Sequence, residues 1–154
     1  MTEARPTETI ANIALSYRFE RLPEDVVLLA HLAILDNLGC ALRGAKEPLV
    51  QFIADELFGK SITGFDLLPG KLAGPLHNQA MLHAAAAHAI DFDDTLPPAL
   101  AAHAGSAVVG AVLPLATELG TSGKHLLTAV IAGYETAARI GDLLHSDHYL
   151  LGFH

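Results

Sequence analysis

Apolar residues recur along most of this chain with the 3.6-residue period of an α-helix. In the first such segment, Ile10, Ile13 and Tyr17 fall on one stripe. Proline, glycine and short polar runs interrupt the period where helices typically begin and end. Six helices are therefore predicted, over residues 8–18, 23–43, 47–58, 75–93, 105–119 and 122–144.

The connections between these segments are short, except for residues 59–75, which are rich in glycine and proline and predict a loop. The fourth segment carries the run AMLHAAAAHAI, and alanine at such density permits helices to approach closely. No internal repeat, low-complexity tract or linker divides the chain. We therefore predict an all-α fold, a multi-helix bundle that forms a single helical domain over residues 1–154.

The composition is unusually apolar for a free-standing domain. Hydrophobic residues make up 51% of the chain, charged residues only 17%, and the mean hydropathy is +0.38. No stretch reaches the roughly 18–20 uninterrupted apolar residues of a membrane span. The two closest stretches, 26–35 and 107–116, predict buried helices. A chain this apolar is expected to cover part of its surface, either as a homodimer or other homo-oligomer or as part of a longer protein.

Net charge indicates which partners to expect, and the cysteine content and the first residues indicate the cellular compartment. The net charge is −8 without basic clusters, which argues against nucleic acid and anionic membranes as partners. The polar start, MTEARPTET, has no apolar segment of a secretory signal. The single Cys40 lies in an apolar run, which predicts a buried, reduced thiol. Together these features predict a cytoplasmic protein.

The densest group of ionisable residues lies in HAIDFDDTLPPALAAHAGS, residues 88–106. It places three aspartates between His88 and His103, at the predicted end of the fourth helix. The helix dipole disfavours carboxylates there, by roughly 0.3–1 kcal/mol each, so their presence requires a reason. On a helix that runs to residue 93, His88, Asp91 and Thr95 share a face, whereas Asp93 and Asp94 point away. The break at Pro97 and Pro98 folds the chain back, so that His103 approaches that face.

Three interpretations of this segment remain open. The carboxylates bind backbone groups of the loop, or Asp91 and His103 form an acid–base pair suited to carbon-acid chemistry, or the aspartates bind Mg²⁺. The third rests on a match to the DxDD signature of isoprenoid enzymes. Their aromatic-lined pockets do not fit a chain with no tryptophan and 6% aromatic residues. A zinc site is disfavoured as well, because His83 and His88 are five residues apart and diverge on a helix. The predicted site therefore contains no metal.

A family resemblance joins several of these segments. The run HAIDFDDT, the later HAGSAV, the stretch AVLPLATELGTSGKHLLTAVIAGYETAARIG, the final GFH and the earlier LDNLGCALRGA resemble the N-terminal part of the MmgE/PrpD family. This family includes 2-methylcitrate dehydratase and cis-aconitate decarboxylase. The resemblance implies a helical domain joined to a smaller α/β lid, usually in a homodimer. It also implies dehydration, decarboxylation or epimerisation of small di- or tricarboxylic acids without cofactor or metal.

Carried over by motif, the resemblance assigns roles to five residues. His103 is implied as the catalytic acid–base group and Asp91 as its catalytic partner. Thr95, His154 and Asp93 are implied as substrate-binding residues. The helix position of Asp93 also suggests structural hydrogen bonding.

The chain also departs from the family pattern. Ala104 stands where proline is common, and His83-Ala84 where Asn-Gly is usual. The lid and its basic residues are absent, so little or no catalysis is expected from the isolated chain. The alternative to a lyase or isomerase is a non-catalytic helical module for oligomerisation or binding.

Overall fold

The computed structural model describes residues 5–96, 103–144 and 150–152, and these residues form helices without a β-strand. Their elements are α1 (Pro6–Ser16), η1 (Phe19–Arg21), α2 (Glu24–Gly44), α3 (Pro48–Phe58), η2 (Gly64–Leu67), α4 (Leu76–His88), α5 (Ala104–Glu118) and α6 (Gly123–Leu144). The all-α prediction is confirmed. The six predicted helices are present in order, and the fourth ends earlier than predicted.

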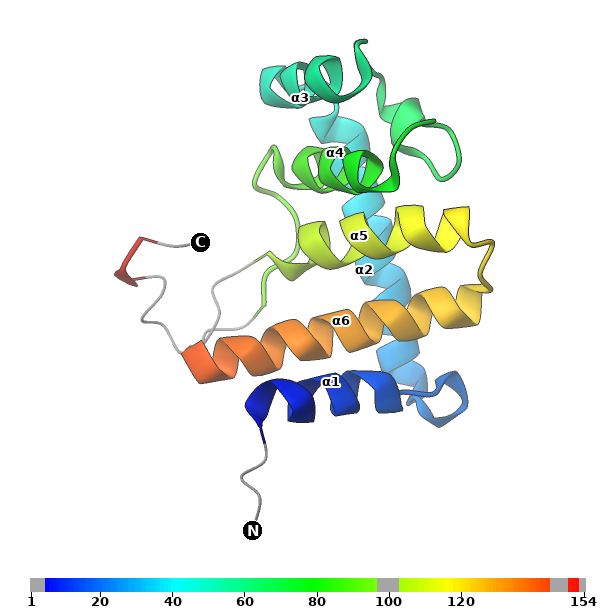
Figure 1. Ribbon diagram of the computed structural model, residues 1–154, viewed down its shortest axis with the longest axis vertical. Helices are drawn as coiled ribbons and strands as arrows, with labels where there is room; N and C mark the ends of the chain where they lie inside the picture. The colour runs from blue at the N-terminus through cyan, green and yellow to red at the C-terminus, as the bar shows by residue number, and fades with distance from the viewer. Residues whose placement is uncertain (1–4, 97–102, 145–149, 153–154) are drawn as a thin grey trace.

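Helix α2 organises the bundle. Figure 1 shows α1, α6, α5, α4 and α3 stacked in that order across it, so that helices far apart in sequence become neighbours along its length. Proline at the α2 boundary and acids in its first turn fit the start of a helix. Left-handed Gly59 ends α3, as expected of a glycine after a helix.

Two apolar clusters form the core, one at each end of α2. The first joins the C-terminal half of α2 to α3, η2 and α4, with Val50 and Leu82 fully buried. The second joins the N-terminal half of α2 to α5 and α6, with Val109 and Val130 fully buried. Helices α4 and α5 bridge the two clusters, and the segment between them carries the acidic motif.

Small residues set the spacing of the central helices. A Cβ added at Gly44 would clash with the carbonyl oxygen of Ala86, so α2 and α4 cross with their backbones in contact. A Cβ at Gly110 would lie 2.8 Å from that of Ala84, which holds α5 equally close to α4. The alanine-rich run of α4 therefore does permit close helix packing, as its composition predicted.

Helix α2 is less buried than its sequence predicted. It buries Ala30, Cys40 and Ala41, as expected for the single cysteine, but a row of leucines on the same helix stays exposed. These are Leu28, Leu29, Leu32 and Leu35, each at least half exposed. By length and composition alone, α2 could also cross a membrane. Only 22% of its most apolar window is buried in the bundle. The prediction of a buried helix over residues 26–35 was wrong for one face, because the period that gives α2 its core face also leaves leucines on the other side. For 107–116, by contrast, Val109 and Leu113 are buried.

Candidate acid–base site

The acidic motif forms a turn, not the last part of a helix. Helix α4 ends at His88, and Asp91 adopts a left-handed conformation with φ of 51° while its N–H donates to the His88 carbonyl at 2.9 Å. Aspartate tolerates this conformation better than most residues. The prediction of a helix to residue 93 was wrong, because the carboxylates that the helix dipole disfavours leave the helix instead. Asp91 and Thr95 therefore do not share a helix face.

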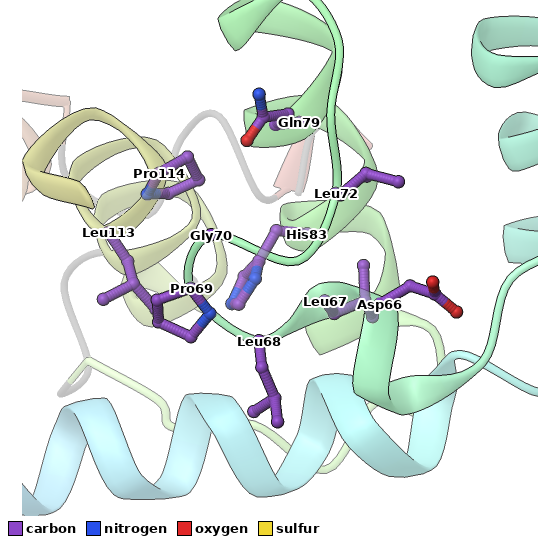
Figure 2. Close-up of a pocket in the computed structure, with 10 residues that line it drawn as sticks. All are labelled: Asp66, Leu67, Leu68, Pro69, Gly70, Leu72, Gln79, His83, Leu113 and Pro114. Carbon is purple, nitrogen blue, oxygen red and sulfur yellow. The ribbon is translucent and has the colours of Figure 1, made fainter. Parts of the chain in front are cut away.

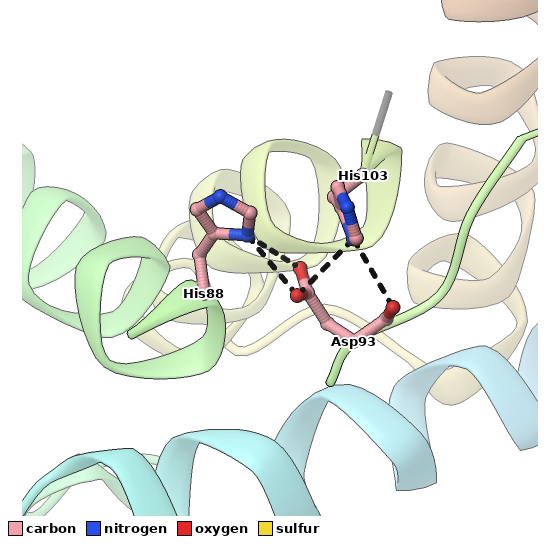
Figure 3. Close-up of side chains that lie close together, drawn as sticks. All are labelled: His88, Asp93 and His103. Carbon is pink, nitrogen blue, oxygen red and sulfur yellow. Dashed lines mark hydrogen bonds and ion pairs between the residues drawn. The ribbon is translucent and has the colours of Figure 1, made fainter. Parts of the chain in front are cut away.

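Asp93 is the centre of a cluster of two imidazoles and one carboxylate (Figure 3). Its side chain is fully buried. His88 donates from Nδ1 to Asp93 Oδ1 at 3.0 Å, and Nδ1 of His103 lies 3.3 Å from the same oxygen. A buried carboxylate is costly unless it is paired and hydrogen-bonded. The two histidines satisfy that requirement, one from the end of α4 and one from the start of α5.

His103 has a second acidic neighbour on the other side of its ring. Its Nε2 lies 3.4 Å from Asp91 Oδ1, while its Nδ1 donates to the backbone carbonyl of Asp93 at 3.1 Å. The Asp91 side chain is 80% exposed and that of His103 is 25% exposed, so this side of the ring opens to solvent. One ring nitrogen is thus fixed by buried groups and the other points toward an accessible carboxylate. This arrangement suits a histidine that transfers protons.

Asp94 joins the turn to the first turn of α5. Its Oδ1 accepts a hydrogen bond of 3.0 Å from the Gly105 N–H, which favours the charged carboxylate at a helix N-terminus. Burial nevertheless raises the pKa of Asp94 above its ordinary value. Burial, followed by the Asp94 charge, likewise raises the pKa of Tyr134. The Tyr134 hydroxyl is buried beside this carboxylate and makes no hydrogen bond of good geometry with any residue that the structure describes.

Thr95 lies on a different surface from the histidines. It is exposed and lines a cleft of about 510 Å³ between α2 and α6, together with Asp94, Tyr134 and Glu135. The walls of this cleft are otherwise apolar. Neither His103 nor Asp91 lines it. The structure therefore brings His103, Asp91 and Asp93 together but leaves Thr95 apart from them.

The buried Asp93 carboxylate contacts two imidazoles, which fits the structural hydrogen bonding expected of it, and its role toward substrate stays a prediction. His154 lies outside the described residues. The residue that sequence reasoning missed is His88, which was paired with Asp91 on the assumption of a continuous helix. Its spacing of five from Asp93 becomes meaningful only once the chain turns after α4.

A second buried polar network joins α4, α2 and the first turn of α5 next to the acidic turn. His83 on α4 contacts Asn37 on α2 at 2.9 Å, and Asn37 donates to the Gly105 carbonyl at 3.1 Å. Burial lowers the pKa of His83 and thus favours the neutral ring in the fold. Figure 2 shows its ring beside the loop around Pro69, at a cavity of about 20 Å³, room for roughly one water molecule. Three helices are thereby held in register at Gly105, next to Asp94. No sequence signal linked Asn37 to His83.

Comparison with known proteins gives a family and nothing more specific. No curated protein and no solved structure matches the chain. The model of the MmgE/PrpD N-terminal domain matches residues 8–154, which includes every segment of the acidic turn, the two histidines and the helices that carry them. The chain therefore belongs to the MmgE/PrpD family and represents its N-terminal domain.

Proposed function

We propose that this chain supplies the acid–base part of an MmgE/PrpD-type active site that acts on small di- or tricarboxylic acids. His103 is the group that takes up and returns the proton, and Asp91 orients it or the substrate. The single observation that carries this proposal is the position of His103, with Nδ1 held by Asp93 and Nε2 within 3.4 Å of the accessible Asp91 carboxylate.

The chemistry follows from this placement. Removing a proton from a carbon next to a carboxylate requires a base that is fixed in direction and open to the substrate. The contacts of Nδ1 with Asp93 fix the plane of the His103 ring. The exposed side then belongs to Nε2, which exchanges a proton with a bound acid. Dehydration and epimerisation begin with this removal of a proton from carbon. Decarboxylation instead breaks a C–C bond and releases CO2, and the protonated His103 would then deliver a proton to the carbon left behind. The choice among them depends on the substrate.

The substrate class comes from the family, because the local charge alone does not select an anion. Among the described residues, the ion-pair partners of Asp91 and Asp93 are imidazoles. A polycarboxylate bound here needs further positive charge, from protonated histidines or from groups outside the described residues. In this proposal the exposed Asp91 carboxylate accepts either a hydrogen bond from a substrate hydroxyl or the proton of His103.

Calorimetric titration with cis-aconitate and 2-methylcitrate tests the proposal. We expect saturable binding that His103→Ala weakens by about 10-fold or more, the loss of one charge-assisted hydrogen bond. His125→Ala is the matched control, since His125 is exposed on α6, and it should bind like the unmodified chain. Binding of neither acid, or equal binding by His103→Ala, would contradict the proposal. Deuterium uptake from D2O into the bound acid, lost in His103→Ala, would show directly that His103 transfers a proton.

A non-catalytic module is the second candidate, and the exposed leucines of α2 favour it. Leu28 and Leu35 are 58% and 67% exposed on one helix, as expected of a surface that another chain or domain covers. We propose that this face mediates self-association. Light scattering after size exclusion should give a dimer or larger, and Leu28→Glu with Leu35→Glu should shift it toward monomer. A monomer before substitution would refute self-association.

A further inference from the structure

The first turn of α5 receives its cap from outside the helix. His103 stands at the N-cap position, but its side chain makes no capping hydrogen bond. The Asp94 carboxylate supplies one, because its Oδ1 accepts the N–H of Gly105, the second residue of α5, at 3.0 Å. In most helices the residue just before the helix provides this cap with its own side chain. Here the acidic turn that follows α4 holds the start of α5.

The preceding residue, Asp93, holds the side chain at the same helix start. Nδ1 of His103 lies 3.1 Å from the backbone carbonyl oxygen of Asp93 and 3.3 Å from its Oδ1, and Figure 3 shows both contacts as dashed lines. Both oxygens only accept hydrogen bonds, so a neutral ring carries its proton on Nδ1 and leaves Nε2 bare. A bare Nε2 on the accessible side is what the proposed base requires.

The contacts between the His103 ring and Asp93 tolerate little movement. Hydrogen bonds from N–H to oxygen are roughly 2.7–3.2 Å long, so one contact is near this upper limit and the other just exceeds it. A shift of a few tenths of an ångström at the start of α5 would break both. Asp94 opposes such a shift, because it is the chain neighbour of Asp93 and is hydrogen-bonded to the helix that begins after His103.

Gly105 permits this grip and is held from a second side. A Cβ at this position would clash with Asp94 Oδ1, so only glycine lets the carboxylate approach so closely. The Gly105 carbonyl accepts from Asn37 of α2 at 3.1 Å in a buried contact. The start of α5 is therefore clamped between the acidic turn and α2, and Asp94 is the part of the clamp that belongs to the turn.

We propose that Asp94 is a positioning residue for His103: by capping α5 at Gly105, it keeps the His103 ring on Asp93 and the bare Nε2 on the accessible side. The inference rests on the proposed function of His103, but the chain without ligand is sufficient to test it. A carboxylate that only stabilised α5 would leave the His103 ring of the folded chain unchanged. A positioning residue must change the state of that ring when it is removed.

Nitrogen-15 NMR of the histidine rings in the ligand-free chain tests this role. At the alkaline end of a pH titration we expect His103 to show a protonated Nδ1 and a bare Nε2. In Asp94→Ala this pattern should be lost, with both nitrogens shifted toward the values of a ring that exchanges between its two tautomers. Asp94→Asn should retain the pattern, because its amide oxygen can still accept the Gly105 N–H. Asp55→Ala is the matched control, since Asp55 is exposed on α3.

An unchanged His103 ring in folded Asp94→Ala would overturn the proposal and leave Asp94 as a helix cap only. Absence of the pattern from the unmodified chain would overturn it as well. So would its loss in Asp94→Asn, because the charge and not the cap would then set the tautomer. Should Asp94→Ala not fold by circular dichroism, Asp94→Ser takes its place, since its shorter side chain also releases the Gly105 N–H. These results need no bound acid, so a failure to bind cis-aconitate would refute the proposed function alone.

Discussion

Gly105 is the residue whose substitution tests the architecture of the site most severely. It lies in the first turn of α5, where its N–H binds the Asp94 carboxylate and its carbonyl accepts from Asn37. A Cβ built here would clash with Asp94 Oδ1 and lie 2.7 Å from the Tyr134 hydroxyl. Gly105→Ala must therefore push the turn away from α5 or push α6 outward.

The expected cost combines two effects. Overpacking of a well-packed region costs about 1–3 kcal/mol. Displacing Asp94 also weakens a charge-assisted hydrogen bond, which contributes about 1.5–3 kcal/mol. The two effects share one displacement and are not additive, so a loss of about 2–4 kcal/mol in the free energy of unfolding is expected. The higher helix propensity of alanine offsets at most about 1 kcal/mol of this.

Urea denaturation followed by circular dichroism measures the loss. Gly39→Ala is the matched control, because Gly39 is within α2 and a Cβ there meets nothing within 4 Å. The control should stabilise the chain by up to about 1 kcal/mol, the opposite sign. If Gly105→Ala is as stable as the unmodified chain, the close contact between the turn, α5 and α6 is wrong. In an Asp94→Ala background, Gly105→Ala should lower the free energy of unfolding by less, because the carboxylate oxygen that the added Cβ would meet first is no longer present.

Two further predictions concern buried polar groups. Burial lowers the pKa of His83 in the fold, so its contribution to stability is complete above the unfolded value of about 6.5 and is lost as pH falls below it. His83→Asn should flatten the decline in urea midpoint between neutral and acidic pH, and an unchanged decline would contradict the assignment. Tyr134→Phe removes a buried hydroxyl that has no hydrogen-bond partner among the described residues, so the variant should be as stable as the parent or more stable by up to about 1 kcal/mol. A clear loss of stability would mean that the hydroxyl does bind Asp94.

The helices were predictable because local signals agree with the tertiary fold. Glycine ends α3 with φ of 64°, and Gly120 follows α5 with φ of 60°, each where the apolar period stops. The start of α2 after Pro23 was equally clear. The end of α4 was not, because alanine continues to favour helix up to the acidic run. The helix dipole and the tolerance of Asp91 for positive φ decide that boundary, and neither effect is part of the apolar period.

The site was only partly predictable for the same reason. Proximity of Asp91 and His103 was expected from the proline break, and the structure places them 3.4 Å apart. The face assigned to each aspartate depended on a helix that does not continue, so Asp93 and Thr95 were misplaced. The pairing of His83 with Asn37 spans 46 residues and leaves no trace in the local pattern. Such pairings depend on how helices cross, which periodicity does not specify.

If the proposed function holds, His103 is the group in this fold that meets a carboxylate ligand. Nitrogen-15 NMR of the histidine rings during titration with cis-aconitate tests it directly. We expect saturable shifts at the ring nitrogens of His103 and at the amide of Asp91, with His83 and His125 unchanged and the response lost in His103→Ala. Shifts spread evenly over the exposed histidines, or a response that persists in His103→Ala, would contradict it.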